Sequence, residues 1–142
     1  MAIIQTLTTS FKVEVAQGLH NFTTGTGDVF KLALYTANAD LGASTTAYTT
    51  SGEVSGPNYT AGGIILTIIT PSFQGTTSYW SFQDVTFTNV TLTTNGALIY
   101  NSTNGNRSVA VLNFGVNITK TAQNLVITFP VNDATNAVLR IA

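Results

Sequence analysis

One strand–turn–strand unit in the second half of the chain constrains the fold more than any other feature. Residues 97–101 (ALIYN) and 108–114 (SVAVLNF) are apolar segments of strand length, and residues 102–107 (STNGNR) join them. The joining segment contains Asn104 and Gly105, residue types that accept the positive φ angles of tight hairpin turns. The sequence therefore predicts an antiparallel β-hairpin at this place.

Other segments of strand length, separated by turn residues, follow one another from residue 29 onward. In residues 29–36, Phe30, Leu32 and Leu34 alternate with a second set, Lys31, Ala33 and Tyr35, so that each set lies on one face of a strand. The remaining predicted strands are 79–82, 85–87, 89–94, 125–129 and 137–141.

Residues 64–70 (IILTIIT) are a nearly continuous apolar run. Such a run predicts a strand that is buried on both faces or that lies at a subunit contact. Pro71 follows it directly, and we expect this proline to end the strand.

One short helix is expected within residues 10–20. Ser10 is the predicted N-cap, and Phe11, Val15 and Leu19 recur at spacings of four, which places them on one helical face. Most of the remaining chain reads as strand and turn. The sequence thus predicts a single domain, residues 1–142, built as an antiparallel β-sandwich or flattened barrel of about eight strands.

A long loop, residues 37–63, separates the first two predicted strands and is rich in glycine. Tyr48 and Tyr59 are expected to pack it down, either as an ordered loop or as a short edge hairpin. Most other aromatic residues alternate with polar ones and are expected in the core. We therefore select Tyr48, Val54, Pro57 and Tyr59 as the candidate interface residues.

Charge is scarce in this chain. Its 142 residues include five basic and six acidic ones, whereas about a quarter of an ordinary soluble domain is charged. The net charge of −1 argues against a nucleic-acid partner, and no apolar run approaches the ~20 residues that would span a membrane. Residues 1–10 do not form a secretory signal. A surface of Thr, Asn, Ser and Gly suits burial against other protein subunits, because little charge has to be desolvated.

The same scarcity leaves little material for catalysis. Cysteine is absent, His20 is the only histidine, and no G-x-S-x-G motif occurs. We expect His20 to bond a terminal helix carbonyl or to face solvent. No metal-binding or phosphate-binding motif is present, so no cofactor and no metal are predicted.

The acidic residues are expected to act as caps and turn makers. No two of them lie closer than twelve residues in the sequence, although a fold could still bring a glycosidase-type pair together. The prediction is that the chain is not an enzyme and has no catalytic residues. The acids are Glu14, Asp28, Asp40, Glu53, Asp84 and Asp133.

Five segments that cover most of the chain form a distinctive set, and within them YTAGG at 59–63 and ALIY at 97–100 stand out. The set resembles small virion structural proteins of tailed bacteriophages. These motifs are not catalytic, and the resemblance carries over no residue role. The segments are 11–22 (FKVEVAQGLHNF), 30–36 (FKLALYT), 41–63 (LGASTTAYTTSGEVSGPNYTAGG), 96–115 (GALIYNSTNGNRSVAVLNFG) and 137–142 (AVLRIA).

The resemblance implies a structural part of a phage particle, assembled in the cytoplasm of the bacterial host. Our first hypothesis is a capsid decoration, or cement, protein whose partners are the major capsid protein and copies of itself, with a homotrimer expected at three-fold sites. The alternatives are a tail, neck or fibre component, a carbohydrate-binding adhesin module that uses Tyr or Trp side chains, and, last, a hydrolytic enzyme.

Overall fold

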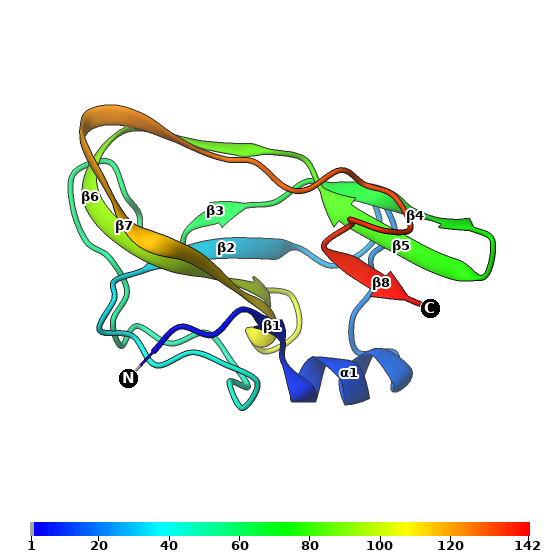
Figure 1. Cartoon of the computed structure of the whole chain (residues 1–142). Helices are drawn as coiled ribbons and strands as arrows, with labels where there is room; N and C mark the ends of the chain where they lie inside the picture. The colour runs from blue at the N-terminus through cyan, green and yellow to red at the C-terminus, as the bar shows by residue number, and fades with distance from the viewer. Residues whose placement is uncertain (1) are drawn as a thin grey trace.

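The computed structural model describes residues 2–142 and contains two antiparallel β-sheets and one short helix (Figure 1). The larger sheet has the strand order β1-β7-β6-β2-β3, and the smaller has the order β4-β5-β8. The predicted mainly β, sandwich-like fold class is therefore confirmed. The elements are β1 (Thr6–Leu7), α1 (Thr9–Ala16), β2 (Phe30–Tyr35), β3 (Ile64–Ile65), β4 (Ile68–Gln74), β5 (Thr77–Phe82), β6 (Val85–Asn101), β7 (Arg107–Ile127) and β8 (Leu139–Ile141).

The predicted hairpin is the turn between the two longest strands, β6 and β7. At this turn Asn101 pairs with Arg107. Gly105 has a φ of 70° and Asn106 a φ of 57°, so the turn uses the left-handed backbone conformations that glycine and asparagine accept most readily. The hairpin prediction is confirmed, with Asn106 rather than Asn104 taking the second left-handed position.

The ribbon of β6 and β7 continues well past this hairpin, to Val85 opposite Ile127. Four shifts in register interrupt the pairing, and such bulges bend a ribbon without ending it. Figure 1 shows the result as a long arch. Segments predicted as separate strands are therefore joined. Residues 85–87, 89–94 and 97–101 lie in β6; residues 108–114 lie in β7, which also contains the predicted strand 125–129 as far as Ile127.

Both faces of the five-stranded sheet are buried. In β2, Phe30, Leu32 and Leu34 belong to one core and Ala33 and Tyr35 to another, as the period of two predicts. We call these the inter-sheet core and the loop core. The inter-sheet core includes Phe11, Leu32, Phe82, Phe129 and Leu139, whereas the loop core consists of Ile3, Ala33, Tyr35, Ala39, Leu41, Leu98, Tyr100 and Val111 and has Tyr48 packed against it.

For the long loop, residues 37–63, the sequence predicts either an ordered loop or a short edge hairpin, and it is an ordered loop. It contains only isolated bridges, at Leu41, Ala47 and Glu53. Backbone hydrogen bonds from Val54 N–H to Leu34 O and from Tyr48 N–H to Asn106 O attach it to the sheet.

The apolar run 64–70 departs from its prediction. It forms two short strands, because residues 64–65 pair with β2 while residues 68–74 form β4 of the other sheet. Ile65 is 60% exposed, so the chain itself does not bury this strand on both faces; a subunit contact stays a prediction. Pro71 does not end β4, since it falls within a bulge between Ile69 and Ser72, where a missing N–H is tolerated.

Helix α1 begins earlier than predicted. Thr8, rather than Ser10, is the N-cap, and its hydroxyl oxygen accepts a hydrogen bond from Phe11 N–H. The buried residues of the helix are Phe11 and Glu14, and Val15 packs partly buried against the inter-sheet core, so the predicted apolar face also contains a carboxylate. No helix among residues 2–142 is long and apolar enough to cross a membrane.

Candidate functional site

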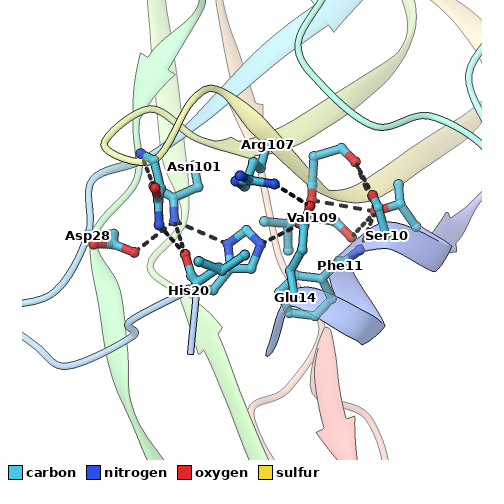
Figure 2. Close-up of polar contacts among 12 residues, drawn as sticks. Ser10, Phe11, Glu14, His20, Asp28, Asn101, Arg107 and Val109 are labelled. Atoms are coloured by element: carbon cyan, nitrogen blue, oxygen red, sulfur yellow. Dashed lines mark hydrogen bonds and ion pairs between the residues drawn. The ribbon is translucent and has the colours of Figure 1, made fainter. Parts of the chain in front are cut away.

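A buried glutamate, Glu14, gathers polar side chains from three parts of the chain (Figure 2). Glu14 Oε1 lies 2.9 Å from His20 Nε2, and Glu14 Oε2 accepts a hydrogen bond of 2.9 Å from Arg107 Nη1. Helix α1 supplies the carboxylate, the segment after the helix supplies the imidazole, and the first residue of β7 supplies the guanidinium. We call this the Glu14 cluster.

Asn101 determines which nitrogen of the imidazole donates. Its side-chain oxygen accepts hydrogen bonds of 3.1 Å from the N–H groups of Thr103 and Asn104, so the amide nitrogen must face the other way. That nitrogen lies 3.1 Å from His20 Nδ1 and 2.8 Å from Asp28 Oδ2. Since the amide can only donate there, His20 Nδ1 accepts, and the ring donates from Nε2 to the glutamate.

The sequence prediction for His20 is wrong. The side chain is buried and bonds other side chains, not a helix carbonyl or solvent. Both ring nitrogens are occupied, and within residues 2–142 no serine or threonine hydroxyl is hydrogen-bonded to the ring. The hydroxyls of Thr8 and Ser108 bond each other instead. The Glu14 cluster therefore holds α1 and the following segment against the β6–β7 turn.

A second carboxylate, half-buried, lies in the long loop. Glu53 Oε1 accepts a hydrogen bond of 2.5 Å from the Tyr48 hydroxyl, and Glu53 Oε2 accepts from the Tyr59 hydroxyl at 2.7 Å and from Gly62 N–H at 2.8 Å. Among the residues described, the ion pair between charged groups joins Arg107 to Glu14, since the His20 ring that accepts at Nδ1 is neutral. Glu53 is thus balanced by neutral donors alone. We call this the Glu53 cluster.

Four of the five tyrosines surround the Glu53 cluster. Tyr35 donates from its hydroxyl to Thr49 O and Tyr100 to Gly62 O, both at 2.6 Å, and Tyr100 stacks on Tyr48 with ring centroids 4.8 Å apart. Desolvation by burial raises the pKa of all four hydroxyls above its usual value. For Tyr48 and Tyr59 the hydrogen bond to the Glu53 carboxylate adds to this rise in pKa.

The four candidate interface residues lie in the long loop at different depths. Val54 is buried in the inter-sheet core, Tyr48 and Tyr59 are half-buried with their hydroxyls on Glu53, and Pro57 is exposed. Their contact with a partner stays a prediction. The sequence reasoning missed Glu53, although an acid flanked by tyrosines five residues before and six residues after it is a signal for a shared hydrogen-bond centre.

The prediction that acidic residues act as caps and turn makers is right for some of them and wrong for others. Asp28 and Asp133 accept backbone N–H bonds in turns, as predicted, and Asp84 accepts one from Phe129 N–H. The expectation is wrong for Glu14 and Glu53, which lie at the centre of side-chain clusters. Among residues 2–142, no group of three or more His, Cys, Asp or Glu side chains could hold a metal ion.

Comparison of the chain with protein-family models, with curated proteins and with solved structures found no match.

Proposed function

We propose that the chain is a structural virion protein of a tailed bacteriophage and that it decorates the capsid, binding between major capsid protein subunits. The proposal assigns it no reaction and no cofactor. The resemblance of its sequence segments to small phage virion proteins supports this role, as does the composition of its surface.

The observation that carries the proposal is a surface with little charge and several exposed apolar side chains. Residues 115–124, the exposed middle of β7, include one charged side chain, Lys120. Such a surface loses little hydration energy when another protein covers it. Large apolar side chains that are exposed in the chain are Ile4, Val13, Val29, Ile65, Phe73, Val116, Val126, Val131 and Ile141.

The β4–β5 hairpin adds a projecting contact to this surface. It extends away from the rest of the molecule at one side of the arch (Figure 1), and Phe73 near its tip is 75% exposed. An exposed phenylalanine gains free energy when it is covered, on the order of 1.5–3 kcal/mol. Many copies bound only to the assembled shell would stabilise that shell by mass action, and a homotrimer fits three-fold positions on a capsid.

A density map of the intact phage particle tests the proposed function. We expect the chain at three-fold or quasi-three-fold positions on the outside of the head, in contact with the major capsid protein. Density for the chain on the tail or neck alone would overturn the decoration role and would support the tail, neck or fibre alternative. Absence of the chain from purified particles would overturn the virion role as a whole.

A further inference from the structure

Three adjoining hollows lie between the β1–α1 segment and β8. Their volumes are about 500, 360 and 300 Å³. Leu7 of β1 and Arg140 of β8 line all three, so the hollows are neighbours, and we call them together the β1–β8 groove. Figure 1 shows the two strands on either side of it.

The lining of the β1–β8 groove is mainly apolar. Leu112, Phe114 and Val138 are only partly buried by the chain itself, and Ile141 of β8 is 53% exposed. The 360 Å³ hollow shares Leu7 and Arg140 with the other two. Partly exposed apolar side chains along the groove favour an occupant that presents several apolar side chains on one face.

The charges that line the groove have one sign. Lys12 and Arg140 line it, and no aspartate or glutamate does. Arg140 Nη1 donates a hydrogen bond of 2.5 Å to Thr135 O. Hydrogen bonds from Asn136 and Thr135 lower the pKa of Asp133, in the segment before β8, and the positive charge of Arg140 contributes to the same shift. Lys12 forms no ion pair within residues 2–142, and its positive charge, beside that of Arg140, favours an occupant that carries carboxylates.

Sheet edges border the groove on both sides. β1 is the last strand on its side of the five-stranded sheet, and β8 is the last strand of the three-stranded sheet. Residues 139–141 of β8 pair with β5 on one side only. An edge strand offers unpaired backbone N–H and C=O groups, which an extended segment from another chain can pair with.

Trp80, beside the groove, has a hydrogen-bond donor without a partner. It is the only tryptophan, it lines the 300 Å³ hollow together with Phe11 and Val15, and its indole N–H has no hydrogen-bond partner within the residues described. A buried donor without an acceptor is unusual in a complete site. This position also makes Trp80 fluorescence a reporter of groove occupancy.

We propose that the β1–β8 groove binds an extended segment of a neighbouring protein subunit, in which apolar residues alternate with at least one aspartate or glutamate. The segment adds a strand to β8, its apolar side chains fill the hollows beside Leu7, and its carboxylate pairs with Arg140 or Lys12. The inference rests on the proposed function in one respect, that the neighbouring subunit belongs to the phage shell.

Selection from a displayed library of random decapeptides tests the binding chemistry on the isolated chain. We expect enriched peptides with alternating apolar residues and at least one Asp or Glu, and a loss of that enrichment on the Arg140→Gln, Lys12→Gln double variant. Enrichment of basic or uniformly polar peptides, or equal enrichment on the double variant, would overturn the proposal.

The best acidic peptide is then titrated while Trp80 fluorescence is followed. We expect a saturable change in emission, a Kd that rises about three- to fivefold in Arg140→Gln, and weaker binding at high salt. Lys120→Gln, on the exposed middle of β7, is the matched control and should bind as the wild type does. Circular dichroism and melting of each variant separate lost binding from lost folding.

Sedimentation of the chain alone tests whether a second copy of the chain occupies the groove. Self-association that Arg140→Gln abolishes, together with failure of the acidic peptide to bind, would overturn the proposed segment in favour of a dimer contact. These outcomes are independent of the particle map, because a chain located on the head could still lack an occupied groove, and a peptide-binding chain could be absent from the head.

Discussion

The Glu14 and Glu53 clusters answer the same physical problem in opposite ways. Glu14 is buried where three segments of the chain meet, whereas Glu53 is half-buried and bonded by residues of the long loop. Glu14 is compensated by the Arg107 guanidinium and by His20, whereas Glu53 is compensated by two tyrosine hydroxyls and one backbone N–H. The first cluster is ionic and reaches solvent through the partly exposed arginine; the second is neutral except for the carboxylate itself.

This difference decides how each cluster should respond to change. An ion pair with a partly exposed partner contributes little and is screened by salt. A half-buried carboxylate held by three neutral donors contributes through several hydrogen bonds at once, and those donors are costly to leave without a partner. The Glu53 cluster should therefore matter more for stability, although it contains no opposite charge.

The largest expected effect comes from the backbone beneath the Glu53 cluster. Gly63 has a φ of 85°, and a Cβ built on it would lie 1.9 Å from Leu32 O, so Gly63→Ala should push the long loop off β2. Gly105 beside the Glu14 cluster has a φ of 70° but open space around it. We expect Gly63→Ala to cost more than about 3 kcal/mol and Gly105→Ala about 1 kcal/mol, measured by urea unfolding. Equal losses in the two variants would contradict the packing described for the long loop.

The next effect in size is expected from Glu53→Ala. It removes the acceptor shared by Tyr48, Tyr59 and Gly62, and should lower the free energy of unfolding by about 3 kcal/mol. Limited proteolysis should then cut within residues 37–63. Glu53→Gln, which keeps an acceptor oxygen, is the control and should lose less. A change below about 0.5 kcal/mol in Glu53→Ala would show that the cluster does not hold the loop.

Alkaline pH should act on the Glu53 cluster through its tyrosines. Burial raises the pKa of Tyr35, Tyr48, Tyr59 and Tyr100 in the folded chain, while unfolded tyrosine has a pKa of about 10. The unfolded state therefore loses these protons first, so their contribution to stability is complete below pH ~10 and is lost progressively above it.

Absorbance at 295 nm and urea unfolding between pH 8 and 12 measure this effect together. We expect most of the tyrosinate signal to appear only as the protein unfolds. Full ionisation of all five tyrosines near pH 10 in a chain that remains folded would contradict the buried geometry.

The smallest effect is expected in the Glu14 cluster. Arg107→Gln removes an ion pair whose arginine side chain is 40% exposed, and should cost about 1 kcal/mol or less. The loss should shrink further in 1 M salt, because the pair is screened in the wild type. A cost as large as that of Glu53→Ala, unchanged by salt, would reverse the ranking of the two clusters.

The sequence predicts the local parts of this fold well. The alternation in β2 and the asparagine–glycine turn between β6 and β7 depend on neighbouring residues, so both can be read from a few positions. The length of β6 and β7 cannot be predicted in this way. A bulge and a strand end both appear in the sequence as a break in the alternation of apolar and polar residues, here near Asn89 and Asn95.

The two clusters escape sequence reasoning for a different reason. Glu14 meets Arg107 across 93 residues, and His20 meets Asn101 across 81; no spacing rule connects such positions. Glu53 is the exception, since Tyr48 and Tyr59 lie close to it in the sequence. Ile65 shows the limit of hydropathy, because an apolar run does not reveal which of its residues the chain covers.

The most direct test of the decoration role uses phage heads that lack this protein. Purified chain is added at increasing concentration, and binding and the melting temperature of the heads are measured together. We predict saturable binding, with the melting temperature of the shell rising as the sites fill. No binding to the heads, or binding that leaves the melting temperature of the shell unchanged, would contradict the account.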